Sequence, residues 1–177
     1  AAFVASPTGS STQSRLWISD GTEAGTRSLT IPGAGAQAMP QHLCEFNGRL
    51  VFSAQAPNLR RLFISDLTDQ GTMVVPDGSL GGVTVAGQPI STRGRLFFAG
   101  LASFRDETGA AVSSGVEPWI SDGTAAGTRM LTDMVPGNQS SSPRNFTAVN
   151  SRVFFTATTP LTGEELWMID LCPGDFD

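Results

Sequence analysis

The sequence contains a single histidine, His42, which stands two residues before Cys44 in a run of strand-forming residues. A thiol and an imidazole support nucleophilic catalysis when the two side chains face each other and a third group orients the base. Residues two apart in a strand share a face, so His42 and Cys44 can be neighbours. No third group is evident in the sequence. We therefore interpret both as ordinary strand residues and predict no catalytic residue.

Acidic residues that recur along the chain raise the question of a calcium site. Calcium needs six to eight oxygen ligands that converge on one point. Each recurring Asp has at most one acidic neighbour, Glu23 or Asp69, which favours a turn-capping role through hydrogen bonds to backbone N–H groups. We expect no cofactor within the chain. Asp175-Phe176-Asp177 is similar to the start of a calcium loop, so calcium is expected only in a tail beyond Asp177. The recurring residues are Asp20, Asp66, Asp122 and Asp170.

Two cysteines, Cys44 and Cys172, are the remaining reactive side chains. In a secreted protein, a disulfide between them could connect the C-terminal end to an earlier part of the chain. Two unpaired, buried thiols fit the sequence about as well.

The elements that carry these residues form an internal repeat. Three positions hold Trp and a fourth holds Phe in otherwise similar segments, with separations of 46, 56 and 48 residues. After the first three anchors, a Gly-Thr pair follows at a constant distance. A second element of the type Asn-Gly-Arg-Leu-Val-Phe recurs in step with the first. The anchors are Trp17, Phe63, Trp119 and Trp167, and the matching Phe residues are Phe3, Phe52, Phe98 and Phe155.

Each repeat contains four short runs rich in Val, Ile, Phe, Trp and Thr, and no segment has a helical period. The best-defined repeat has runs at 42–46, 49–54, 61–65 and 72–75, with the hairpin turn Asn47-Gly48 between the first two. The fold class is therefore predicted to be all-β. Four strands in about 50 residues indicate a β-propeller-like array, with a β-trefoil as the alternative.

The domain organisation follows from the repeat. Residues 1–171 are predicted to form a single repeat domain of about three and a half units, and residues 172–177 to begin a C-terminal tail or linker. The first and last units are incomplete, so the array could close with a second chain or with further repeats. An exposed edge of an incomplete unit is prone to strand pairing.

The segments Trp17–Thr26 and Glu117–Thr128 resemble the bacterial ELWxxDGT repeat family, as does Glu165-Leu166-Trp167. The resemblance covers nearly the whole chain. Arg15 and Arg61 depart from it, because they stand where the family has Glu. The family is found in secreted and surface proteins and is propeller-like, with no established enzymatic activity. The resemblance therefore implies a secreted or cell-surface location.

Loop variation suggests where a partner would bind. The connections on one face of the repeats are short and uniform, whereas those on the opposite face vary in length, and repeat proteins commonly place such insertions on their binding face. The longest variable connection is predicted to be a loop over 100–116. Its candidate contact residues are Phe104, Arg105, Asp106 and Glu107.

Composition narrows the class of partner. The chain has 177 residues and a net charge of −5, and its 11 basic residues are all Arg. This balance argues against nucleic acid as the principal partner, and no apolar run is long enough to span a membrane. We expect a non-enzymatic extracellular module for protein or glycan binding. The alternatives are a self-assembling surface or filament subunit, and a carbohydrate-active hydrolase or lyase that uses loop carboxylates.

Overall fold

The computed structural model describes residues 1–6, 14–57, 59–77, 83–105 and 107–171. These residues form fifteen strands, one short 3-10 helix and no α-helix, so the predicted all-β class is confirmed. The elements are β1 (Ala2–Ala5), β2 (Arg15–Ile18), β3 (Arg27–Ser28), η1 (Gly35–Gln37), β4 (Gln41–Phe46), β5 (Arg49–Ala56), β6 (Leu59–Ser65), β7 (Met73–Val74), β8 (Thr84–Val85), β9 (Ile90–Thr92), β10 (Arg95–Arg105), β11 (Ala111–Ser121), β12 (Arg129–Met130), β13 (Arg144–Val149), β14 (Arg152–Thr159) and β15 (Gly163–Asp170).

The strands form four antiparallel sheets, one for each repeat. Repeat 1 is β1-β2-β3, repeat 2 is β4-β5-β6-β7, repeat 3 contains β8 to β12, and repeat 4 is β13-β14-β15. Repeat 2 has the simple meander predicted for a propeller-type unit. The two repeated sequence elements lie on adjacent strands, and their aromatic residues are partners in register. The pairs are Phe3↔Trp17, Phe52↔Phe63, Phe98↔Trp119 and Phe155↔Trp167.

The chain divides into two compact units, residues 1–75 and 76–177. Each unit contains two repeats whose side chains form one core, because every sheet has one apolar face that it must bury. In the first unit, Leu16 of repeat 1 belongs to the same cluster as Phe52 and Phe63, whose rings stack with centroids 5.5 Å apart. In the second unit, Phe97 of repeat 3 belongs to the same cluster as Phe155 of repeat 4.

Turn chemistry sets the register of the sheets. Asn47 and Gly48 have φ angles of 50° and 75°, so the predicted hairpin turn between β4 and β5 is confirmed. The strand before this turn contains a bulge between Gln41 and Cys44, and His42 has a φ of 57° within it. The bulge recurs in β13, where Asn145 has a φ of 59°. Repeats 2 and 4 thus share a bulge in the first strand of the sheet as well as the regular strand pairing.

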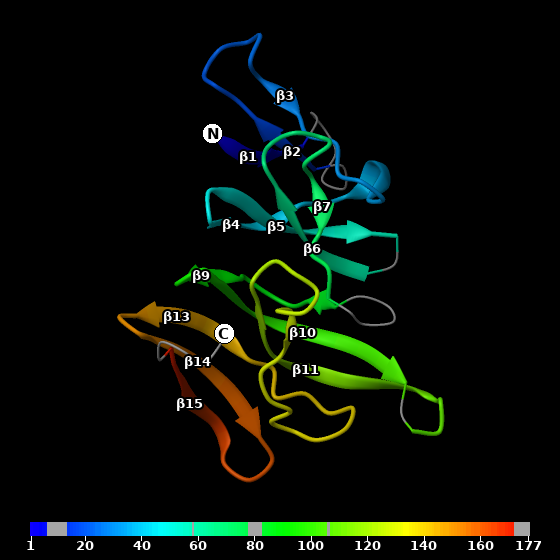
Figure 1. The fold of residues 1–177 in the computed structure, drawn as a ribbon, viewed down its shortest axis with the longest axis vertical. Coiled ribbons are helices and arrows are strands. Elements are labelled where there is room, and N and C mark those ends of the chain that lie inside the picture. Colours follow the sequence, from blue (N-terminus) through cyan, green and yellow to red (C-terminus); the bar gives the residue numbers. More distant parts are fainter. Residues whose placement is uncertain (7–13, 58, 78–82, 106, 172–177) are drawn as a thin grey trace. The chain divides into compact units, whose positions relative to one another are not determined.

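The predicted loop over 100–116 is wrong. Strands β10 and β11 continue through it as an antiparallel hairpin, in which Leu101 pairs with Val116 and Arg105 with Ala111 (Figure 1). A bulge after Leu101 accommodates the extra length, and the hydroxyl of Ser114 accepts a hydrogen bond from Ala102 N–H at 3.1 Å. The insertion is rich in Ala, Ser and Val, so it extends the existing ladder and satisfies its backbone groups there.

Candidate functional site

Three of the four predicted contact residues are described, and they lie at the tip of the β10–β11 hairpin. Phe104 and Arg105 are the last residues of β10, and their backbones are paired with β11. Asp106 lies outside the described residues. Glu107 is exposed in the turn that follows. Their role in binding stays a prediction.

Of the two cysteines, the structure describes only Cys44. Cys44 is half-buried, and its Sγ donates a hydrogen bond to the carbonyl of Glu45 at 3.3 Å. Cys172 lies outside the described residues, as does the predicted tail over 172–177. The disulfide and the calcium expected beyond Asp177 stay predictions.

His42 is held by a neighbouring strand. Its Nδ1 lies 3.0 Å from the hydroxyl of Ser53 on β5. The bulge at this position interrupts the two-residue alternation on which a shared face with Cys44 depended. Burial lowers the pKa of His42 below its usual value, and the positive charge of Arg60 lowers it further. His42 therefore favours the neutral form and serves as a strand residue, as we interpreted it.

A common hydrogen-bonded turn follows the anchor strand in repeats 1, 2 and 3. In repeat 3, one oxygen of Asp122 accepts hydrogen bonds from the Thr124 N–H at 2.8 Å and the Thr124 hydroxyl at 2.7 Å. The hydroxyls of Ser121 and Thr128 lie 2.7 Å apart beneath it. Equivalent contacts join Asp20 to Thr22 and Asp66 to Thr68. The predicted turn-capping role is confirmed for Asp20, Asp66 and Asp122, and for Asp170 it stays a prediction because the residues that follow Leu171 lie outside the described ranges.

The geometry of this turn explains why a Gly follows each capping Asp at the same distance in repeats 1, 2 and 3. A Cβ at Gly127 would lie 2.1 Å from the Asp122 carboxylate, so only glycine fits beneath the capped turn. Gly25 and Gly71 are in the same position against Asp20 and Asp66. Hydrogen bonds from the following Thr lower the pKa of all three Asp residues below the usual value. The D-x-T-x-x-G-T pattern is therefore a structural turn whose carboxylate oxygen is already used.

Asp69 illustrates how an acidic residue near such a turn is used. Its Oδ1 accepts hydrogen bonds from the Thr30 N–H at 3.1 Å and from the Arg27 guanidinium at 3.2 Å. These contacts connect repeat 2 to the end of β3 in repeat 1. The Thr30 contact is the main reason that the pKa of Asp69 is lowered. The carboxylates of Asp66 and Asp69 thus have separate structural partners.

Glu117 is the leading Glu of the repeat motif in repeat 3, and its side chain is fully buried. Its carboxylate accepts hydrogen bonds from the Ser141 N–H at 2.8 Å, the Ser141 hydroxyl at 2.6 Å and the Met134 N–H at 3.2 Å. These donors belong to the connection between β12 and β13. Glu117 therefore fixes the chain that enters repeat 4, a role that the sequence analysis did not recognise.

The outer edge of β15 is the most apolar exposed feature of the described residues. Leu166 is 68 % exposed, Trp167 37 % and Met168 48 %. The equivalent residues of repeat 2 are Leu62, Phe63 and Ile64, all of which are buried. In that repeat β7 pairs with Phe63 and Ile64, whereas no strand among the described residues pairs with the outer side of β15. We call this surface of Leu166, Trp167 and Met168 the β15 edge.

Backbone hydrogen bonds in the other repeats indicate how a further strand would pair with the β15 edge. In repeats 1 to 3 the carbonyl of the residue before the anchor aromatic accepts a hydrogen bond of 2.8 Å. The donor is the backbone N–H of the residue that follows β3, β7 or β12. Leu166 provides the equivalent carbonyl in repeat 4. The sequence signal for this site is the lack of a Gly-Thr turn after Trp167. The three bonds are Leu29 N–H to Leu16, Val75 N–H to Leu62 and Leu131 N–H to Pro118.

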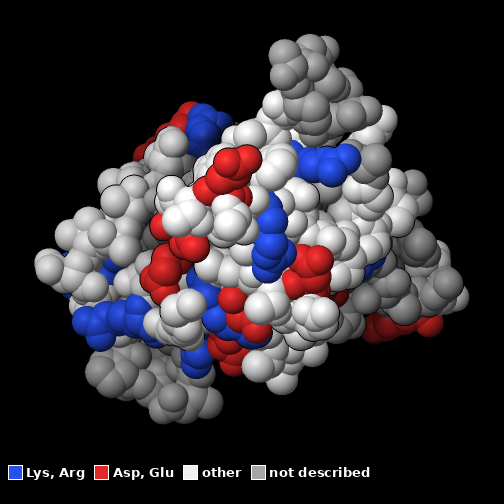
Figure 2. Space-filling view, turned by 90° about the horizontal axis from the view of Figure 1, so that it is seen from above, with Lys and Arg blue, Asp and Glu red and all other residues white. Residues whose placement is uncertain are grey.

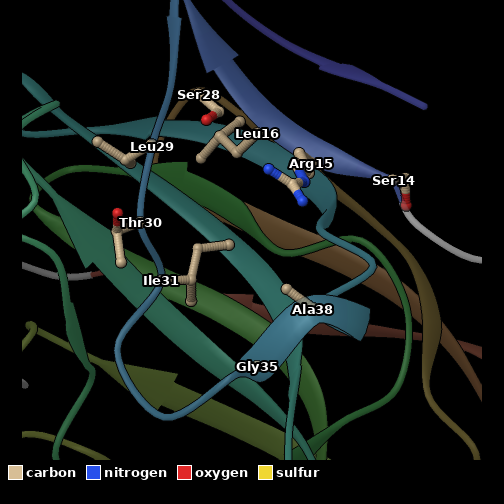
Figure 3. Close-up of a pocket in the computed structure, with 9 residues that line it drawn as sticks. All are labelled: Ser14, Arg15, Leu16, Ser28, Leu29, Thr30, Ile31, Gly35 and Ala38. Atoms are coloured by element: carbon tan, nitrogen blue, oxygen red, sulfur yellow. The ribbon is translucent and has the colours of Figure 1, made fainter. Parts of the chain in front are cut away.

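Two cavities occur within the compact units. One, of about 290 Å³, lies in repeat 1 between β2, the end of β3 and the η1 turn (Figure 3). The other, of about 240 Å³, lies in the second unit beside Pro143 and Phe146. Among the described residues, no Asp or Glu lines either cavity. Within the described ranges, no three His, Cys, Asp or Glu side chains are grouped as a metal site would require.

Charge and hydropathy define the remaining surface. On the face shown in Figure 2, Arg side chains are interspersed with acidic ones, without an extended patch of one sign. Examples of close pairing are Arg144 with Glu164 and Arg152 with Asp170. Over the residues that the structure describes, no helix has the length and apolar character needed to cross a membrane.

Comparisons with known proteins support the fold. No family model and no curated protein matches the chain. Among solved structures, it is similar to TolB from Acinetobacter baumannii, a β-propeller, with a TM-score of 0.55 and 11 % sequence identity. The match covers 96 % of this chain and 38 % of the TolB chain. Each sheet of the described residues is open, and none of them closes on itself. The chain is thus all-β and propeller-like, with its described strands in several small sheets.

Proposed function

We propose that this chain is a non-enzymatic, propeller-type repeat module that binds a protein partner at the β15 edge. The observation that carries the proposal is the exposure of Leu166, Trp167 and Met168, whose counterparts in repeat 2 are buried. The resemblance to the ELWxxDGT repeat family supports a secreted or cell-surface setting for this module.

A protein partner fits this edge better than a glycan does. An edge strand offers unpaired backbone N–H and C=O groups to an extended peptide, and side-chain pockets add specificity. Trp and Met are enriched in protein interfaces. The partner is expected to pair with Trp167 and Met168 as β12 pairs with Trp119 and Ile120.

The neighbouring repeats indicate the chemistry of that partner. Strand β3 of repeat 1 places Arg27 opposite Ile18, and strand β12 of repeat 3 places Arg129 opposite Ile120. Ile18 and Ile120 are the equivalents of Met168. In repeat 2 the corresponding residue is Met73, opposite Ile64, so two of the three covering strands have a basic residue at this position. The strand that covers the β15 edge is therefore expected to be short and extended, with a basic residue opposite Met168.

The proposal is tested by selecting displayed peptides on the immobilised wild-type chain. Binding is then compared in Leu166→Asp and in the control Leu161→Asp, which changes a 95 % exposed leucine in the turn before β15. We expect Leu166→Asp to weaken binding about tenfold or more, equivalent to about 1.4 kcal/mol, and Leu161→Asp to leave it unchanged. Peptides that bind all three proteins equally would contradict the proposal, and binding of glycans alone would replace it.

A further inference from the structure

The repeat 1 cavity occupies the place that the Glu117 carboxylate fills in repeat 3. Arg15 precedes Trp17 by two residues, as Glu117 precedes Trp119, so the two side chains start from equivalent positions on β2 and β11. Glu117 is fully buried there, whereas Arg15 is exposed. The substitution replaces an internal anion with a cation at the wall of a cavity of about 290 Å³.

The opposite wall of the cavity is equivalent as well. Ala38 corresponds to Ser141, because their carbonyls accept the same backbone hydrogen bond from the following repeat, at 2.7 Å from Gln55 N–H and at 2.8 Å from Thr158 N–H. The next residues, Met39 and Ser142, also share a positive φ, of 42° and 48°. In repeat 3 the Ser141 N–H donates to Glu117. Ala38 lines the cavity at the matching position of repeat 1.

The rest of the lining combines apolar and hydroxyl groups. Leu16, Leu29 and Ile31 are buried members of the first unit's core and form the apolar wall. Ser28 and Thr30 also line the cavity. Figure 3 shows Arg15 on β2 on one side, with Gly35 and Ala38 of the η1 turn on the other. The volume is near the lower limit of small-molecule sites, roughly 300 Å³.

We propose that this cavity binds a small aliphatic carboxylate, with the Arg15 guanidinium as its counter-charge and Leu16, Leu29 and Ile31 around its alkyl chain. The ligand would replace the internal carboxylate that repeat 3 obtains from Glu117. Arg is suited to this role because its planar fork of donors matches the two oxygens of a carboxylate. The carboxylate can come from a free acid or from the C-terminus of a peptide, and both present the same group to Arg15.

The experiment is a titration of the full chain with sodium butyrate, followed by backbone amide chemical shifts. Its neutral control is butanamide, which has the same alkyl chain without the charge. We expect butyrate to shift the amides of Leu29 to Ala38 saturably, and butanamide to have no such effect. Acetyl-alanyl-leucine and its C-terminal amide distinguish a peptide C-terminus from a free acid as the preferred source.

Two variants that make the same charge change locate the site. Arg15→Gln should weaken butyrate binding by about tenfold, because a charge-assisted contact is lost. Arg129→Gln changes an exposed arginine on β12 and should leave binding unchanged. The proposal is overturned if butyrate gives no saturable shifts, if butanamide binds equally well, or if both variants weaken binding to the same extent.

Discussion

Strands β11 and β15 carry the same Glu-x-Trp motif, yet β11 is covered, whereas the described residues leave the outer side of β15 exposed. Trp119 is 6 % exposed and stacks on Phe98 at 6.4 Å, whereas Trp167 is 37 % exposed. Glu117 is buried with three donors, whereas Glu165 is exposed. The difference lies in the chain that surrounds each strand. β12 and its connection to β13 cover β11, and no described segment covers β15 in the same way.

The comparison teaches that one sequence motif serves two purposes. Where neighbouring segments cover the strand, the Trp of the motif packs in the core and the Glu accepts hydrogen bonds that hold the covering segment. Where the strand is at an edge, the same residue types form an apolar surface suited to a partner. Paired substitutions at equivalent positions of β11 and β15 therefore test this distinction.

The largest contrast is expected between Trp119→Ala and Trp167→Ala. Removing a buried Trp leaves a cavity, so Trp119→Ala should lower the free energy of unfolding by about 4 kcal/mol. Trp167→Ala should cost about 1 kcal/mol, because much of its side chain is already in water. Urea denaturation followed by circular dichroism measures both. Equal losses would show that β15 is as well covered as β11.

The next contrast concerns the two Glu residues. Glu117→Ala leaves the Ser141 and Met134 donors buried without an acceptor, so we expect a loss of about 3 kcal/mol. Glu165→Ala should change the free energy of unfolding by less than about 0.5 kcal/mol, because the residue is exposed. Urea midpoints of both variants test this. A small effect of Glu117→Ala would mean that the clamp does not hold the connection.

A third contrast compares Gly127 with Gly163, the glycines beside the two anchor strands. Gly127→Ala places a Cβ against Asp122 and should cost about 2 kcal/mol, because the capped turn must open. Gly163 has a φ of 75° but open space around it, so Gly163→Ala should cost about 1 kcal/mol from backbone strain alone. Thermal unfolding of the two variants gives the order. A larger loss at Gly163 would contradict this view of the turn.

The smallest effect is the pH dependence of the covered turn. The Thr124 hydroxyl, assisted by its N–H and by Arg95, lowers the pKa of Asp122 below the usual 3.8. A lowered folded-state pKa means that the ionised Asp122 stabilises the fold above about pH 3.8. This contribution is lost as the pH falls through the lowered pKa.

Urea midpoints of wild type and Asp122→Asn between about pH 2 and pH 6 measure this contribution. The difference between the two proteins should be present at pH 6 and shrink toward pH 2. A difference that stays constant over this range would mean that the charge of Asp122 does not contribute.

Much of the fold was predictable because short-range chemistry determines it. The Asn47-Gly48 turn, the aromatic anchors and the capping Asp122 all follow from preferences of a few adjacent residues. The extension of β10 and β11 was not predictable in the same way. Leu101 and Val116 are compatible with either loop or strand, and only their pairing across the hairpin decides between the two.

The candidate sites depend on contacts between distant residues. Phe104 and its neighbours were predicted as contact residues because the insertion there is long. The roles of Glu117 and of Arg15 at the equivalent position were not predictable from the sequence, since both depend on which loop returns to the strand. The lack of a Gly-Thr turn after Trp167 was the one local signal for the β15 edge.

The sequence by itself determined the repeat, the all-β class and the capped turns, because strand propensity, turn geometry and Asp–Thr hydrogen bonds act over a few residues. Only the tertiary structure decided which copies of the motif are buried. Burial depends on whether a later segment covers the strand, and the Glu-x-Trp motif by itself contains no record of that. Glu117 with its three donors, the cavity beside Arg15 and the open edge at Trp167 are three results of one repeated sequence in different surroundings.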